Sequence, residues 1–136
     1  MSDPKSPIRD SMTPAPFSIG RAQPMAEASR RMREHRIRHL PVLEGGHVVG
    51  IVSDRDISMV ESLPGVDPEV VTVEEAMTPD PYAISPTTPL VEVVSAMADH
   101  KYGTAVVMEH GKLVGIFTVV DALRAFAASL RGAQAS

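Results

Sequence analysis

Two hydroxyl–carboxylate pairs occur at the same spacing in the sequence, and their residue types are suited to binding a sugar phosphate. Ser53 precedes Asp56 by three residues and Thr118 precedes Asp121 by three, each pair following a glycine and two apolar residues. Where such a hydroxyl lies at a helix N-terminus, the free N–H groups and the helix dipole favour an anion such as phosphate. The carboxylate then lies about one turn further on, where it can accept two hydrogen bonds from a ribose diol.

An ordinary helix N-cap followed by an early acidic residue gives the same pattern, and one copy would not decide between these interpretations. The pattern belongs, however, to an internal repeat at an offset of 65 residues, which places Met12-Thr13-Pro14 on Met77-Thr78-Pro79. Between residues 12 and 56, 16 of 45 positions are identical to their partners at 77–121. Two copies of one supersecondary unit favour two related sites over coincidence, and both carboxylates are expected to be partly exposed.

The hydrophobic pattern of each copy predicts the elements that position these pairs. In the first copy we expect a strand at 17–19, a helix from 24, strands at 40–43 and 48–52 around a glycine-containing turn, and a helix from 53. In the second copy we expect a strand at 81–84, a helix from 89, strands at 105–108 and 113–117, and a helix from 118. Each copy is therefore strand–helix–strand–strand–helix, and the fold class is α+β.

The repeat also sets the expected domain boundaries. We expect a flexible N-terminal arm at 1–8, a first repeat at 9–61, a linker at 62–73, a second repeat at 74–130 and a fraying tail at 131–136. Because a repeat of about 50 residues is marginal alone, the two repeats are expected to pack on each other. Surplus apolar surface on the helices predicts a homodimer, with Met32, Met59, Val60, Met97, Leu123 and Phe126 as the interface candidates.

Composition and charge argue against several classes of function. A formal net charge of −4 argues against a nucleic-acid partner held by bulk electrostatics. The chain contains no cysteine, which removes disulfides, thiolate nucleophiles and cysteine-based zinc sites, and the cytosol is the simplest location. The first residues lack the apolar core of a signal peptide, and no run reaches the ~20 apolar residues that span a membrane.

The remaining polar clusters indicate neither catalysis nor a metal site. His35 and His39 are four residues apart, but His39 falls beyond the predicted helix, so the two cannot share a helical face. His35 and His100 occupy matched helix ends, where they are expected to cap carbonyl groups. Ser53 has no histidine–aspartate partners, so no enzyme is expected. The arginine cluster at 30–36 is interpreted as a solvated helix face, with attraction of a nucleotide or an acidic partner as the alternative.

The two copies together resemble a tandem pair of cystathionine-β-synthase-type (CBS) domains, often called a Bateman module. The resemblance covers about residues 9–130 and rests on the two Met-Thr-Pro segments, on 37–42, and on 49–56 with its counterpart at 114–121. It implies two repeats related by a pseudo-twofold axis, with clefts between them that bind AMP, ADP, ATP or S-adenosylmethionine. It also implies a non-catalytic regulatory module that signals occupancy to a separate effector protein, and pairing of two such modules into a flat disc.

The resemblance also implies roles for individual residues. Asp56 and Asp121 would hold the ribose, Ser53 and Thr118 would lie by the ribose and phosphate, and residues around each short strand would clasp the adenine. In some members a cleft combines the adenine pocket of one repeat with the aspartate of the other. The expected ligand-binding residues are Phe17, Ile19, Ile37, Arg38, His39, Pro41, Ser53, Arg55 and Asp56 in the first copy, and Tyr82, Ile84, Tyr102, Gly103, Thr104, Thr118 and Asp121 in the second.

The two expected sites are unequal. Arg38 and His39 in the first copy can meet phosphates, whereas their counterparts in the second copy, Gly103 and Thr104, carry no charge. We therefore expect one good phosphate site and one weak or empty site. The alternatives that the sequence leaves open are a structural dimerisation module with vestigial clefts, a sensor of S-adenosylmethionine, and an enzyme acting on nucleotides.

Overall fold

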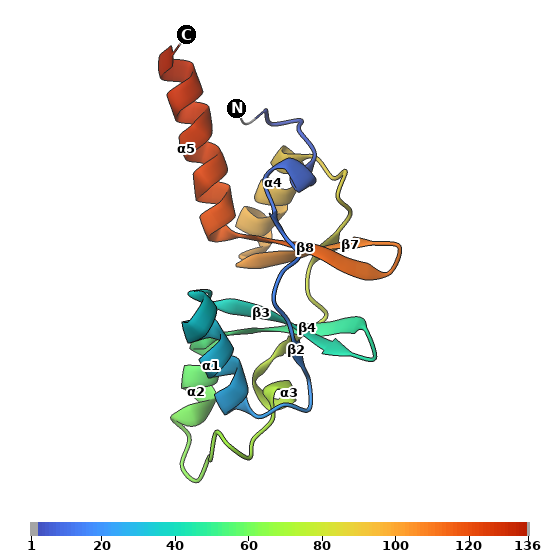
Figure 1. Cartoon of the computed structure of the whole chain (residues 1–136). Helices are drawn as coiled ribbons and strands as arrows, with labels where there is room; N and C mark the ends of the chain where they lie inside the picture. The colour runs from blue at the N-terminus through green and yellow to red at the C-terminus, as the bar shows by residue number, and fades with distance from the viewer. Residues whose placement is uncertain (1–2, 136) are drawn as a thin grey trace. The chain divides into compact units, whose positions relative to one another are not determined.

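The computed structural model describes residues 3–135, which divide into two compact units (Figure 1). Unit 1 contains Met1–Pro16 together with Tyr82–Ser136, and unit 2 contains Phe17–Pro81. Unit 1 thus joins the start of the chain to the second repeat, so a compact unit and a sequence repeat are different stretches of chain.

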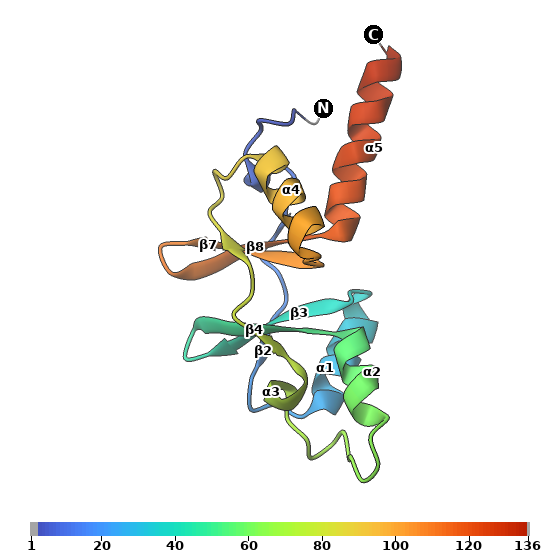
Figure 2. The ribbon, with the colours of Figure 1, turned by 180° about the vertical axis from the view of Figure 1, so that it is seen from behind.

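Unit 2 is a four-stranded sheet with its long helices on one face. Its elements are β2 (Ile19–Gly20), α1 (Met25–His35), β3 (His39–Glu44), β4 (His47–Ser53), α2 (Asp54–Glu61), α3 (Val73–Ala76) and β5 (Thr78–Pro79). The sheet order is β2-β3-β4-β5, with β2 parallel to β3 and the other neighbours antiparallel. Both views place α1 and α2 on the same side of this sheet (Figure 2). Met25, Ala28 and Met32 are buried because their helical spacing puts them on the α1 face that meets the core.

Unit 1 repeats this arrangement. Its elements are a 3₁₀ turn η1 (Ile8–Asp10), β1 (Thr13–Pro14), β6 (Ala83–Ile84), α4 (Leu90–His100), β7 (Thr104–Glu109), β8 (Lys112–Thr118) and α5 (Val119–Ala135). The sheet order is β1-β8-β7-β6, with β6 parallel to β7. Its core contains Ile8, Val93, Val107 and Phe117, all fully buried. The predicted α+β order is confirmed in both repeats.

The two Met-Thr-Pro segments are exchanged between the repeats. β1, from the first repeat, pairs with β8 of the second, and β5, from the second repeat, pairs with β4 of the first. The glycine on each receiving strand is needed for this contact. A Cβ at Gly50 would stand 2.6 Å from Met77 Sδ, and a Cβ at Gly115 would collide with Met12 Sδ. Each repeated glycine therefore makes one packing contact with the methionine of the other repeat, whose side chain occupies the space that a Cβ on the glycine would fill.

The segment before each exchanged strand supplies carbonyl groups to the start of a helix. The N–H groups of Leu90 and Val91 in α4 donate to the carbonyl oxygens of Ser6 and Pro4, each at 2.8 Å. In unit 2, the N–H of Met25 in α1 donates to the carbonyl of Val71 at 2.9 Å. Both helices begin after a proline without a side-chain cap, so these carbonyls satisfy N–H groups that the helix itself leaves unpaired.

The two ends of the chain and the linker between the repeats therefore differ from the sequence-based expectation. Residues 3–8, expected to be a flexible arm, pack on unit 1 through these hydrogen bonds and through Ile8, which is fully buried. The linker expected at 62–73 makes the equivalent contacts in unit 2 and already contains the first residue of α3. At the other end α5 runs to Ala135, so most of the expected fraying tail is helical. Met1, Ser2 and Ser136 lie outside the described residues.

Candidate functional site

The Ser53–Asp56 pair lies where β4 passes into α2. The Asp56 N–H donates to Ser53 Oγ at 3.0 Å, and the Ser53 N–H donates to Asp56 Oδ2 at 3.0 Å, a reciprocal capping box. The carboxylate is half-buried, and within residues 3–135 its second oxygen, Oδ1, accepts no hydrogen bond. The cap and the ligand interpretations are therefore compatible, because the cap uses only one of the two carboxylate oxygens.

The Thr118–Asp121 pair has the same geometry but a different surrounding. The Thr118 N–H and hydroxyl both donate to Asp121 Oδ2, at 2.9 and 3.2 Å. The Thr13 hydroxyl donates to the other oxygen, Oδ1, at 3.1 Å, and the Arg124 guanidinium lies 3.8 Å from it. Asp121 is only 6% exposed, so the expectation that both carboxylates are partly exposed is wrong for this one. The hydrogen bond from Thr13 reaches it because β1 pairs with β8, the strand that leads into α5.

The basic pair of the first repeat lies beside the Ser53–Asp56 pair. β3 begins at His39, which faces Ser53 in the antiparallel register, and the Asp54 N–H donates to the Arg38 carbonyl at 2.9 Å. Burial lowers the pKa of His39; Asp54 and Asp56 act in the opposite direction, and Arg38 adds to the lowering. The structure thus brings Arg38, His39, Ser53 and Asp56 to one edge of unit 2.

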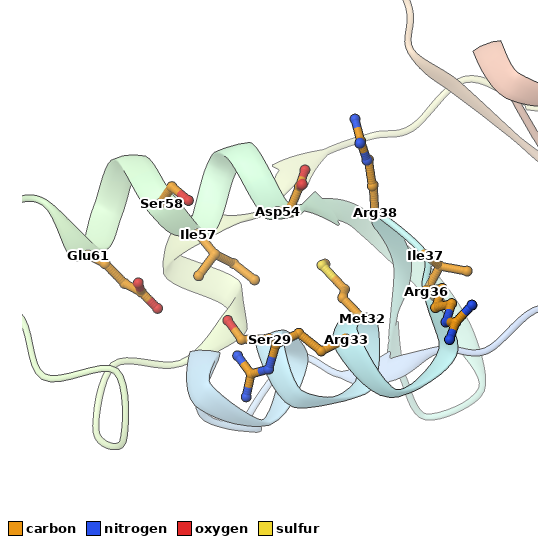
Figure 3. Close-up of a pocket in the computed structure, with 10 residues that line it drawn as sticks. All are labelled: Ser29, Met32, Arg33, Arg36, Ile37, Arg38, Asp54, Ile57, Ser58 and Glu61. Carbon is orange, nitrogen blue, oxygen red and sulfur yellow. The ribbon is translucent and has the colours of Figure 1, made fainter.

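A pocket of about 520 Å³ opens between α1 and α2 next to this edge (Figure 3). Met32 and Ile57 form its apolar floor, and Arg38 and Asp54 lie together at one rim. The other lining residues are Ser29, Arg33, Arg36, Ile37, Ser58 and Glu61. Of the expected ligand residues only Ile37 and Arg38 line it. The arginine cluster is the sequence signal for Arg33 and Arg36, and their place in the lining favours the alternative interpretation, attraction of a nucleotide or an acidic partner, over a purely solvated face.

The four arginines of the cluster at 30–36 make two kinds of contact. Arg30 and Arg31 both pair with Glu27 on the same helix, and Arg31 also donates to the Ser18 carbonyl at 2.7 Å. Arg33 and Arg36 line the pocket instead. Half of the cluster therefore stabilises α1 and its junction with the preceding segment, and half leaves guanidinium groups beside the pocket.

Aromatic rings lie at matched places in the two units. In unit 2, Phe17 stacks on His35 with ring centroids 3.6 Å apart. In unit 1, Tyr102 stacks on Tyr82 at 5.0 Å and on His100 at 5.1 Å. His35 and His100 stack on aromatic rings, a contact that the expected carbonyl-capping role did not foresee. Phe17 and Tyr102 are 50% and 40% exposed, which leaves ring surface that a base can contact.

The other expected ligand residues are mostly packing residues in this structure. Ile19, Ile84 and Pro41 are buried in the sheets. The Gly103 carbonyl accepts from the Val119 N–H at 3.3 Å, and Arg55 is exposed in the first turn of α2. The Thr104 hydroxyl is buried and has no hydrogen-bond partner within the described part of the chain.

Two classes of site are not found in the described residues. Residues 3–135 contain no group of three or more histidine, aspartate or glutamate side chains arranged to hold a metal ion. In the same range, no helix combines the length and the apolarity needed to cross a membrane.

A pair of α+β repeats, each with a capped Ser/Thr–Asp motif where its hairpin meets a helix, defines the class of this protein. The chain belongs to the CBS domain family: the family model matches residues 8–62 and 73–128. The resemblance stated from the sequence is therefore confirmed.

Similar proteins include several that bind adenosine compounds. The CBS domain-containing protein YhcV of Bacillus subtilis is 28% identical over 116 residues, which cover 85% of this chain and 82% of YhcV. The CBS domain pair of MJ0100, solved with 5′-methylthioadenosine and S-adenosyl-L-methionine, aligns with a TM-score of 0.83 at 25% identity, over 93% of this chain and 99% of that one. CBSX2, solved with AMP, aligns with a TM-score of 0.79 at 25% identity, over 90% and 97%.

Proposed function

We propose that this chain is a non-catalytic regulatory module that binds an adenine nucleotide of the AMP, ADP or ATP class and signals its occupancy to another protein. The observation that carries the proposal is the grouping of Arg38, His39, Ser53 and Asp56 at one edge of unit 2. Two cationic or protonatable groups, a helix N-terminus and a carboxylate with a free oxygen suit a phosphorylated ribose. The ligands of similar CBS pairs support the adenosine class.

Each group has one role in this proposal. Asp56 Oδ1 accepts the ribose hydroxyls, Ser53 lies by the ribose and phosphate, and Arg38 with His39 meets the phosphate. The exposed ring of Phe17 and the side chain of Ile37 contact the base. The corresponding residues of unit 1 form the weaker site, because Gly103 and Thr104 cannot replace the two basic groups.

Signalling follows from linkage. A ligand that lies in clefts between the repeats favours one arrangement of them, and an effector protein that prefers this arrangement responds. The clefts, the effector and a cytosolic location are parts of the proposal. S-adenosylmethionine is the alternative ligand, which the complex of MJ0100 favours. A structural module with vestigial clefts is the alternative function.

The proposed homodimer uses α5. Met32 and Met97 are core residues and are not available for an interface, but Leu123 and Phe126 are each 60% exposed. With Val119 and Leu130 they form an exposed apolar row at steps of four, three and four residues, the spacing of a coiled-coil seam. A second copy offers the same row, so α5 pairing about a twofold axis would bury both.

Calorimetric titration with AMP, adenosine and S-adenosylmethionine tests the proposal. Wild type should bind AMP more tightly than adenosine, and Arg38→Ala/His39→Ala should lose at least about tenfold more affinity for AMP than for adenosine. Asp56→Ala should weaken both by roughly 1.5–3 kcal/mol, because the ribose is common to them. His47→Ala, which removes an exposed imidazole from the same unit, is the control. Absence of binding by wild type to all three compounds would favour the structural module.

A further inference from the structure

The two aspartates of the repeated motif, Asp56 and Asp121, accept hydrogen bonds from different sets of donors. The difference comes from residues that occupy matched positions in the two repeats. Thr13 corresponds to Thr78, and both stand on the exchanged strands β1 and β5. The Thr13 hydroxyl donates to Asp121 Oδ1 at 3.1 Å. Thr78, in contrast, makes no hydrogen bond to Asp56 within residues 3–135.

The charge partner differs in the same way. Arg124 lies 3.8 Å from Asp121 Oδ1, whereas the matched position in α2 is Met59, which carries no charge. The two oxygens of Asp121 therefore accept hydrogen bonds from Thr118 and Thr13, Arg124 adds an ion pair, and the side chain is 6% exposed. Because Oδ1 already accepts from Thr13 and the side chain is almost fully buried, we expect a ribose hydroxyl to bind there by replacing the hydroxyl of Thr13.

The contact also anchors the start of the chain to unit 1. Thr13 is 108 residues from Asp121 in sequence and lies between two backbone contacts of the same segment. On one side the Ile8 N–H donates to the Thr88 carbonyl at 2.8 Å, and on the other the Ala15 N–H donates to the Val114 carbonyl at 3.2 Å. A hydroxyl bound to a buried carboxylate between these points stabilises the whole docked segment.

We propose that Thr13 is the residue that decides whether unit 1 can bind a nucleoside: its hydroxyl holds Asp121 in an anchoring role, and a ribose must displace it. Asp56 accepts a ribose directly. The ligand part of this inference rests on the proposed function, whereas the anchoring part does not. By linkage, a nucleoside bound at Asp121 weakens the docking of residues 3–16 on unit 1. Docking of this segment lowers the affinity for the nucleoside by the same factor.

The anchoring part is tested without ligand by amide hydrogen exchange of the peptide that spans residues 8–16. Thr13→Ala should increase exchange of the Ala15 amide by at least about tenfold, since a hydrogen bond to a charged group is lost. Thr13→Ser retains the hydroxyl and should preserve wild-type protection. Thr78→Ala, the matched change on β5, should leave this peptide unchanged. Equal protection in wild type and Thr13→Ala would overturn the anchoring role.

The ligand part is tested by titrating adenosine into variants that carry Asp56→Ala, which isolates unit 1. Adding Thr13→Ala should tighten adenosine binding by about tenfold, because the alanine both frees and uncovers Asp121 Oδ1. Adding Thr13→Ser or Thr78→Ala should leave the affinity unchanged. No tightening by Thr13→Ala would overturn the inference if wild type binds adenosine. If wild type binds no adenosine compound, the proposed function fails instead, and the exchange experiment alone decides the anchoring role.

Discussion

Acidification from about pH 7.5 to about pH 5.5 is expected to change the stability of the free protein and its affinity for AMP in opposite directions. In the free protein, burial holds the pKa of His39 below its ordinary value of 6.5. The folded state then binds the proton less readily than the unfolded chain. The stability that His39 contributes is therefore complete above pH 6.5 and is lost as the pH falls from there through the lowered folded value.

The size of both effects is bounded by one proton. A single group changes the free energy of unfolding by at most about 1.4 kcal/mol per pH unit between its two pKa values. A phosphate beside His39 favours the imidazolium, so AMP binding takes up a proton and tightens by at most about tenfold per pH unit. The second ionisation of the phosphate, near pH 6, limits this gain at lower pH. Adenosine has no phosphate, so its affinity should not increase on acidification.

Urea unfolding and AMP calorimetry at intervals across this pH range measure the two slopes. His39→Gln keeps a polar side chain but removes the titration, so it should flatten both slopes relative to wild type. His47→Gln, an exposed imidazole on the same sheet, should retain them. Wild-type slopes in His39→Gln, or AMP affinity that weakens steadily below pH 7.5, would refute the placement of the phosphate beside His39.

Three further outcomes are expected. Gly115→Ala should lower the free energy of unfolding, measured in urea, by about 1–3 kcal/mol, because the added Cβ collides with the thioether of Met12. Gly20→Ala, whose Cβ would make only ordinary contacts, should be nearly neutral, and equal effects of the two changes would contradict the packing argument. Phe126→Glu should turn a dimer into a monomer by light scattering, and Val91→Glu on α4 should not; a wild-type monomer at tens of micromolar excludes the dimer. Asp121→Ala should destabilise the free protein by about 1–3 kcal/mol, measured by urea unfolding, because the donors of Thr13 and Thr118 lose a charged acceptor; wild-type stability would contradict this.

The family, the α+β order of each repeat and the local geometry of the motif were predictable from the amino-acid sequence. These follow from short-range information: apolar periodicity, prolines that open helices, and a hydroxyl three residues before a carboxylate, which the structure forms into caps at Ser53 and Thr118. The repeat itself is a comparison of the chain with itself and needs no structure. The pairing of His39 with Ser53 did not follow in this way, because the register that the hairpin turn sets shifts by one residue between Val42 and Leu43.

Which segment completes which sheet became clear from the three-dimensional structure alone. The exchange of β1 and β5, the docking of residues 3–8 and the burial of Asp121 all depend on partners far apart in the chain, up to 108 residues for Thr13 and Asp121. No local pattern encodes such a choice, because the polar, proline-containing N-terminal segment acts through backbone carbonyl groups that every sequence possesses. The two motifs are thus similar in sequence, and the contacts of Thr13 and Arg124 make them physically different.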